Sequence, residues 1–128
     1  MRRRPATDDR GRLWLLLEPE RRRERMRGLL AIGPAPRGVG LLLRDARVVH
    51  TIGMRCAIGV AFLDDDLRVR TVRAVGPGRL AGPVRGARHV LEVAPDADLA
   101  IGDRLQLVTA PSEADPTSRA YLARAPVP

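Results

Sequence analysis

Aromatic residues and cysteine are scarce in this sequence of 128 residues. Trp14, Phe62 and Tyr121 are the only aromatic residues, so the core must be built from Leu, Val, Ile and Ala. Three aromatic rings also give little opportunity for base stacking, on which many proteins that bind single-stranded nucleic acid depend. The single cysteine, Cys56, excludes an internal disulfide framework and a zinc site with several cysteines, and it is compatible with a reducing compartment.

Long hydrophobic runs are missing as well. The apolar run nearest the N-terminus covers residues 13–17. It is shorter than the roughly 7–15 residues of a signal-peptide core and far shorter than the roughly 20 residues of a membrane-spanning helix. We therefore expect a cytoplasmic protein with no membrane partner.

Lysine is absent, so all 23 basic residues are arginines, and they outnumber the 15 acidic residues to give a net charge of +8. Such a charge usually suggests an anionic partner. However, arginine without lysine, together with abundant Ala, Gly and Pro, is typical of a GC-rich bacterial genome. Codon usage explains the arginines better than a nucleic-acid interface does, and we do not expect nucleic acid to be the partner.

The length allows one domain. We expect a flexible N-terminal arm at residues 1–11, a single mostly β domain at 12–109 and a partly disordered C-terminal tail at 110–128. Pro19 and the helix-forming residues after it predict one helix over about 19–30. Runs of strand length lie at 12–18, 39–45, 55–64, 67–75, 88–93 and 103–108.

Turn residues separate these runs. Asp64–Asp66 lies between two hydrophobic runs and predicts a tight hairpin turn, and the Gly- and Pro-rich stretch 76–86 predicts a surface loop. The alternation in 67–75 slips near Thr71–Val72, which a β-bulge would absorb. The predicted fold is an antiparallel β-sandwich or partly closed barrel of about six strands with one N-terminal helix.

Five short motifs occur in an order that resembles a known family. They are Arg25-x-x-Gly28-Leu29-Leu30, Gly40-Leu41-Leu42-Leu43, the stretch from His50 to Arg55 followed by Ile58 to Asp64, Val90-Leu91-Glu92, and Gly102-Asp103-x-Leu105. Over about residues 13–108 the chain resembles the domain of unknown function 192 family, also called uncharacterised protein family 0127. The resemblance implies a compact, mostly antiparallel β fold with one helix near its start, no assigned activity, and a signature at residues 50–64. Where similar members have an aromatic residue, a proline and an acid, this chain has Cys56, Ala57 and Gly59.

The residues around Gly53 are the candidate binding site. Gly53 permits a backbone that can turn amide groups toward a ligand, and Arg55 offers a fork of donors that matches a carboxylate or phosphate. We assign ligand contacts to His50, Thr51, Met54 and Arg55. In the alternative interpretation Gly53 only makes a turn, and Arg55 caps a sheet edge or pairs with Glu92.

The sequence indicates a catalytic or metal-binding site less strongly than it indicates the binding site around Gly53. Cys56 with His50 or His89 is the only Cys/His set, and a cysteine at the start of an apolar strand usually acts as a small hydrophobic residue. On a regular strand His50 and Cys56 would lie about 20 Å apart, too far to bind one metal ion. We therefore expect no catalytic residue, no metal and no cofactor.

The expected function is a non-catalytic binding module for a small anionic ligand or a protein segment. Two alternatives stay open. One is a hydrolase-like enzyme that uses Cys56 or the acids Asp64–Asp66. The other is a nucleic-acid-binding protein that uses the arginine-rich helix with Arg21, Arg22, Arg23, Arg25 and Arg27, although the same spacing also gives an ordinary salt-bridged helix surface.

Overall fold

The structure is a computed structural model that describes residues 2–19 and 36–108. All the regular structure in this part of the chain is β, so the mostly β fold is confirmed. Apart from Pro19, the helix expected at 19–30 lies outside the described residues, as does the tail at 110–128. The strands are β1 (Arg2–Thr7), β2 (Leu13–Glu18), β3 (Val39–Leu43), β4 (Val49–His50), β5 (Ile58–Leu63), β6 (Val69–Val75), β7 (Leu80–Ala81), β8 (His89–Val93) and β9 (Gln106–Leu107).

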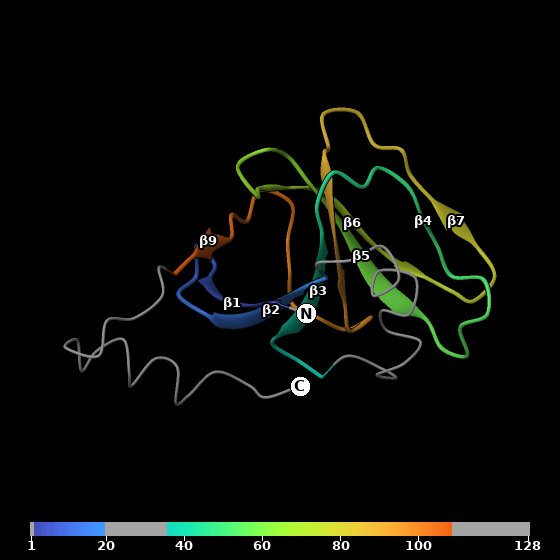
Figure 1. The fold of residues 1–128 in the computed structure, drawn as a ribbon, viewed down its shortest axis with the longest axis horizontal. Helices are drawn as coiled ribbons and strands as arrows, with labels where there is room; N and C mark the ends of the chain where they lie inside the picture. The colour runs from blue at the N-terminus through green and yellow to red at the C-terminus, as the bar shows by residue number, and fades with distance from the viewer. Residues whose placement is uncertain (1, 20–35, 109–128) are drawn as a thin grey trace.

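Seven of these strands form one curled sheet in the order β6-β5-β8-β3-β2-β1-β9, with β4 and β7 beside it as a separate two-stranded ribbon (Figure 1). The sheet is antiparallel except for β2 and β3, which run parallel, with Leu15 beside Val39. The predicted antiparallel pairing is therefore confirmed for the other strand pairs of this sheet and wrong at β2 and β3. Parallel neighbours need a long crossover connection, and the chain supplies it with residues 19–38, most of which lie outside the described part.

The two ends of the curled sheet meet at one corner. Leu67 and Val69, at the start of β6, exchange backbone hydrogen bonds with residues 102–105, which lead into β9. The bonds run from the Val69 amide to the Asp103 carbonyl at 2.7 Å, from the Gly102 amide to the Val69 carbonyl at 2.8 Å and from the Leu105 amide to the Leu67 carbonyl at 3.0 Å. This contact satisfies backbone groups that an open sheet edge would leave exposed.

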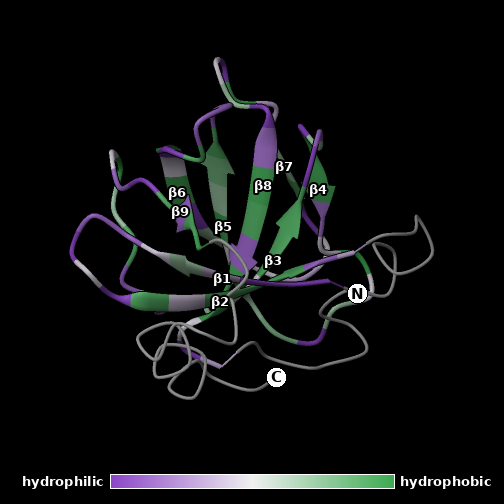
Figure 2. Cartoon of the chain, turned by 60° about the vertical axis from the view of Figure 1, so that its left-hand side comes forward, coloured by the Kyte–Doolittle hydropathy of each residue, from purple (hydrophilic) through white to green (hydrophobic). Residues whose placement is uncertain are grey.

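The central strands β3, β5 and β8 are buried along their whole length. Side chains alternate between the two faces of a strand, so burial of every residue requires cover on both faces. On one face Phe62, Val60 and Val90 belong to one apolar cluster, and on the other Leu63 and Leu91 belong to a second. Hence β3 and β5 are continuous apolar runs in the sequence, whereas β8 also contains His89 and Glu92, so it is partly purple in Figure 2.

The β4–β7 ribbon covers part of the first face. Val49 and Ala81 pair across the ribbon and point into the cluster around Phe62. Gly82 continues β7 with φ +94°, and a Cβ at this position would collide with the Arg47 carbonyl oxygen. The close approach of the two chain segments therefore requires glycine.

The N-terminal segment differs from the expected loose arm. Residues 2–7 form β1, which pairs with β2 from Arg2 opposite Glu18 to Thr7 opposite Leu13. Only Ala6 is buried in β1, so the sequence has no apolar alternation there. Backbone pairing on both sides, with β2 and β9, holds this strand in the sheet.

The hairpin between β5 and β6 forms at the predicted acidic turn. The Leu67 amide donates to the Asp64 carbonyl at 3.0 Å, and the Asp64 carboxylate accepts from the Asp66 amide at 2.9 Å. The register then changes from Phe62 opposite Thr71 to Leu63 opposite Val69. The irregularity thus falls at Arg70, one residue before the predicted slip.

Candidate functional site

The segment around Gly53 forms an exposed turn between β4 and β5. The Met54 amide donates to the Thr51 carbonyl at 3.1 Å, and Gly53 has φ +86°. A positive φ at the third residue is the pattern of a type II turn, which favours glycine at that position.

Thr51 holds this turn in place rather than facing a ligand. Its side chain is fully buried, and its hydroxyl donates to the Gly76 carbonyl at 2.6 Å and accepts from the Arg79 amide at 2.9 Å. The Thr51 amide and carbonyl also bond to Arg79 and Gly78. Thr51 therefore makes four hydrogen bonds that tie the turn to residues 76–79, and its side chain does not face outward to make the predicted ligand contact.

The other three predicted site residues lie close together along the chain but differ in exposure. His50 is exposed on β4, Met54 is half-buried against the cluster around Phe62, and Arg55 is exposed. Among the described residues, Arg55 has no ion pair, so it does not pair with Glu92.

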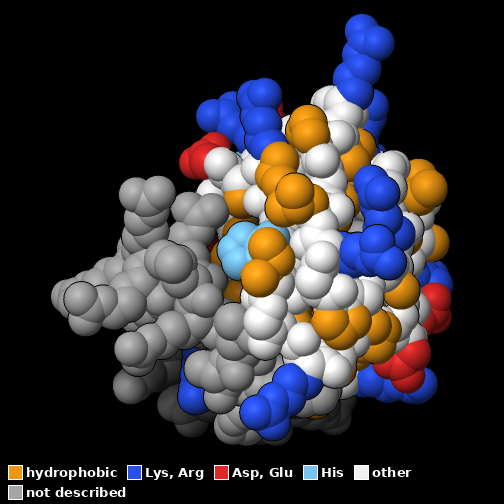
Figure 3. Space-filling view, turned by 90° about the vertical axis from the view of Figure 1, so that its right-hand side faces the viewer, with side chains coloured by type: hydrophobic (Ala, Val, Ile, Leu, Met, Phe, Trp, Pro, Cys, Tyr) orange, Lys and Arg blue, Asp and Glu red, His pale blue; other side chains and the backbone are white. Residues whose placement is uncertain are grey.

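Three large apolar side chains surround His50 on the outer surface of the ribbon. His50 on β4 lies directly opposite Leu80 on β7, so these two side chains share one side of the ribbon, and Val48 and Ile52 are the residue just before β4 and a residue of the turn after it. The exposed fractions are 48% for Val48, 61% for Ile52 and 73% for Leu80. We call these four side chains the ribbon face. On this side of the molecule Figure 3 shows a histidine among hydrophobic side chains with arginines nearby.

The chain segments that contain the ribbon face carry arginines and no acidic residue. Residues 46–63 and 67–91 contain no acidic residue, and they contain two and six arginines, respectively. Two of these eight pair with acids outside the two segments, Arg68 with Asp9 and Arg88 with Asp45 and Asp65. Arg47, Arg55 and Arg79 are exposed and make no ion pair within the described part of the chain.

Of the residues in the enzyme hypothesis, His89, Asp64 and Asp65 make structural hydrogen bonds or ion pairs. Cys56 is half-buried and makes no hydrogen bond to a described residue. His89 is buried, and its Nδ1 accepts from the Asp45 amide at 3.0 Å. Burial lowers the pKa of His89 and keeps the ring neutral. Asp64 shapes the hairpin turn, and Asp65 pairs with Arg88 at 3.3 Å.

The described residues contain neither a metal-binding cluster nor a membrane-spanning helix. Over residues 2–19 and 36–108, no three His, Cys, Asp or Glu side chains gather closely enough to hold a metal ion. The same residues contain no helix long and apolar enough to cross a bilayer.

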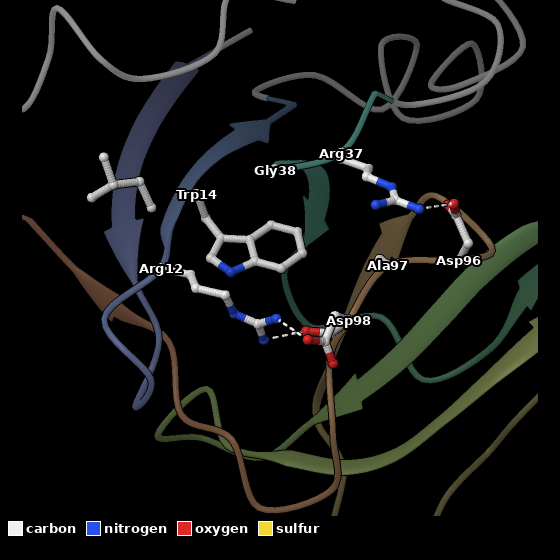
Figure 4. A pocket seen from close by; sticks show the side chains of 8 residues that line it. Arg12, Trp14, Arg37, Gly38, Asp96, Ala97 and Asp98 are labelled. Carbon is white, nitrogen blue, oxygen red and sulfur yellow. Dashed lines mark hydrogen bonds and ion pairs between the residues drawn. The ribbon is translucent and has the colours of Figure 1, made fainter.

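A pocket of about 290 Å³ lies on another part of the molecule (Figure 4). Three segments build it: the start of β2, the residues before β3 and the turn after β8. An indole ring forms part of its wall, and an ion pair stands on each side of that ring in Figure 4. The lining residues are Arg12, Leu13, Trp14, Arg37, Gly38, Asp96, Ala97 and Asp98.

One wall of this pocket is fixed by a buried carboxylate. The Asp8 side chain accepts from Trp14 Nε1 at 3.1 Å, from Arg12 Nε at 2.8 Å and from the amides of Arg10 and Arg12. Burial acts to raise the pKa of Asp8, but the bonds from Trp14, Arg12 and Arg10 outweigh it and lower the pKa. Asp8 is therefore an anion that holds Trp14 and Arg12 in fixed positions.

Glu92 is a second buried acid, and it lies on β8. It is 6% exposed, and Leu41 and Val60 stand opposite it on the neighbouring strands. No described side chain or amide donates a hydrogen bond to its carboxyl group. Burial raises its pKa from 4.5 to about 7.

Comparison with known proteins gives a fold and no family. Neither a family model nor a curated protein matches the chain, so the resemblance to the domain of unknown function 192 family stays a prediction. Two solved structures are similar, each with a TM-score of 0.66. The first is a "putative transcription regulator" from Sinorhizobium meliloti 1021, with 19% identity, 82% of this chain covered and 92% of that chain. The second is a protein of unknown function from Novosphingobium aromaticivorans DSM 12444, with 16% identity, 81% of this chain covered and 83% of that chain. At these identities the similarity shows the fold alone.

Of the residues in the ribbon face and the pocket, only His50 was predicted from the sequence. The absence of acids from 46–63 and 67–91 is visible in the sequence and could have indicated the ribbon face. The pocket had no such signal, because its residues come from positions 12–14, 37–38 and 96–98.

Proposed function

We propose that this protein is a non-catalytic binding module whose ribbon face docks an acidic and apolar segment of another protein. The observation that carries the proposal is the set of three exposed large apolar side chains, Val48, Ile52 and Leu80, on segments that contain no acidic residue and that carry exposed arginines. We place this activity in the cytoplasm.

The apolar side chains favour a protein segment over a small anion. Clustered apolar side chains on a surface mark places where another protein binds more often than scattered ones do. A small anion such as phosphate would engage Arg55 and leave Leu80 and Ile52 in water. A segment with alternating acidic and apolar residues would cover these side chains and neutralise the arginines at once.

The unpaired arginines supply the charge preference. Arg47, Arg55 and Arg79 flank the ribbon face and have no carboxylate partner among the described residues, so an incoming carboxylate need not displace one. Each guanidinium can take a carboxylate in a two-point contact. The arrangement attracts acidic segments and repels basic ones.

A synthetic peptide tests the proposal. A fluorescein-labelled peptide of alternating Glu and Val residues is titrated with the full chain, and fluorescence anisotropy reports binding. We expect binding that weakens with salt, because exposed charges are screened. A peptide of alternating Lys and Val residues should not bind.

Two variants locate the contact. Leu80→Ser should weaken binding of the Glu–Val peptide by about tenfold, since burial of a leucine side chain contributes about 1.5 kcal/mol or more. Ile101→Ser is the matched control, because Ile101 is 70% exposed and lies outside the ribbon face. Arg55→Ala should also weaken binding.

Several outcomes would refute the docking function. They are equal losses in Leu80→Ser and Ile101→Ser, unchanged affinity in Arg55→Ala, or equal binding of the Lys–Val peptide. Binding of a DNA duplex without binding of the Glu–Val peptide would replace the proposal with the nucleic-acid alternative.

A further inference from the structure

We propose that the pocket beside Trp14 binds a small zwitterion with an apolar side chain, of the kind that a free apolar α-amino acid represents. The pocket is built from segments other than the ribbon face, so this inference does not depend on the proposed function. It rests on the cavity, its aromatic wall and the two ion pairs at its mouth.

The size and the wall suit a small, partly apolar ligand. The volume of about 290 Å³ lies near the lower end of small-molecule sites, which span roughly 300–1,000 Å³. Leu13, Trp14 and Ala97 give the lining an apolar part. Trp14 is held by its hydrogen bond to Asp8, so this wall exists before a ligand arrives.

The two ion pairs decide the charge of the ligand. Arg12 pairs with Asp98, and Arg37 pairs with Asp96 at 2.7 Å. A purely anionic ligand would meet both carboxylates, and a purely cationic ligand would meet both guanidinium groups. A molecule with one ammonium and one carboxylate group matches a site in which each charge stands beside its opposite.

Arg37 and Asp96 are the pair with spare hydrogen-bonding capacity. Within the described structure Arg37 donates through Nη2 alone, to Oδ2 of Asp96. Their side chains are 78% and 61% exposed, and ion pairs this exposed contribute little to stability, so a ligand can open them. The ligand carboxylate then binds the guanidinium of Arg37, and the ligand ammonium binds the carboxylate of Asp96.

Arg12 and Asp98 form the fixed side of the mouth, and their contacts rather than burial fix them, because the Asp98 side chain is itself 75% exposed. Arg12 donates to the buried Asp8 as well as to Asp98, and Asp98 also accepts from Arg10 at 3.1 Å. These shared contacts hold the pair against the start of β2. The ligand side chain therefore enters between a fixed pair and a pair that opens, with the indole ring as its apolar contact (Figure 4).

The single tryptophan makes the test direct, because excitation at the red edge of the absorption band, where Tyr121 does not absorb, reports Trp14 alone. L-Leucine is titrated into the full chain, and emission together with the indole NH cross-peak in a ¹H–¹⁵N spectrum is followed. We expect a saturable change in both signals. Leucinamide lacks the carboxylate, 4-methylpentanoate lacks the ammonium group and glycine lacks the side chain, and each should bind at least about tenfold more weakly than leucine.

Three variants assign the contacts. Arg37→Gln and Asp96→Asn should each weaken leucine binding by about tenfold or more, because each removes a charged partner. Arg85→Gln is the control, since Arg85 is an exposed arginine outside the pocket. Circular dichroism confirms that each variant is folded, which the exposure of these side chains leads us to expect.

The inference fails on any of three results. Leucine gives no saturable signal, 4-methylpentanoate or glycine binds as tightly as leucine, or Arg85→Gln loses as much affinity as Arg37→Gln. These results leave the peptide experiment on the ribbon face unaffected, so the two proposals can fail separately.

Discussion

Glu92→Gln should stabilise the protein at alkaline pH and leave its stability unchanged at acidic pH. Glu92 is 6% exposed between Leu41 and Val60, and no described group donates to its carboxyl. Its charged form is therefore unfavourable in the folded protein. Glutamine has nearly the same shape and cannot ionise, so the substitution removes only the charge.

The pKa of Glu92 gives the size and direction of the effect. Burial raises this pKa from 4.5 to about 7, a difference of 2.5 units that corresponds to about 3 kcal/mol. Between pH 4.5 and 7 the folded protein binds more protons than the unfolded chain. The free energy of unfolding therefore falls as the pH rises through this window, and the loss is complete above the folded pKa.

Urea denaturation of both proteins, followed by circular dichroism from pH 4.5 to 8.5, measures this difference. His89 acts in the opposite direction, because burial lowers its pKa and its contribution is lost as the pH falls below 6.5. Subtraction of the wild-type curve from the Glu92→Gln curve cancels the His89 contribution. The difference in the free energy of unfolding should rise from near zero at the acidic end to about 3 kcal/mol at the alkaline end. A difference that is the same at pH 5 and pH 8 would refute the reasoning.

Three further substitutions test the parts that hold the two surface sites. Thr51→Val should lower the free energy of unfolding in urea by about 1–3 kcal/mol, because the Gly76 carbonyl and the Arg79 amide lose their buried partner. Gly82→Ala should lower the melting temperature and weaken binding of the Glu–Val peptide, because a Cβ at φ +94° collides with the Arg47 carbonyl oxygen. An unchanged peptide affinity would contradict this prediction. Asp8→Asn should shift Trp14 emission to longer wavelength, since it weakens the contacts that fix the indole ring, and an unshifted spectrum would show that Asp8 does not hold it.

The strands that the sequence predicted are those with enough buried side chains to leave a pattern. β3, β5 and β8 are covered on both faces, and β3 and β5 are continuous apolar runs. β1 was missed because it buries Ala6 alone and is held by backbone pairing. β4 and β7 have two residues each, too few to show a period.

Pairing between strands was harder to predict than the strands themselves. The parallel pairing of β2 with β3 depends on how the chain crosses between Glu18 and Val39, and hydrophobic periodicity contains no information about direction. The turn at Gly53 was predictable from glycine alone. The inward direction of Thr51 was not, because its partners come from residues 76–79, which the fold brings beside it.

The distribution of charge separates the docking function from a general affinity for polyanions. A chain that bound phosphate backbones through charge alone would need its arginines spread along a continuous surface with water-exposed surroundings. Here the uncompensated arginines belong to the segments that also expose Val48, Ile52 and Leu80, whereas the pocket side pairs Arg12 and Arg37 with carboxylates. A phosphate backbone cannot cover apolar side chains, so a nucleic acid on this surface would bind with steep salt dependence and be insensitive to Leu80→Ser. An acidic protein segment would lose affinity through both salt and Leu80→Ser, and this combination distinguishes the two partners.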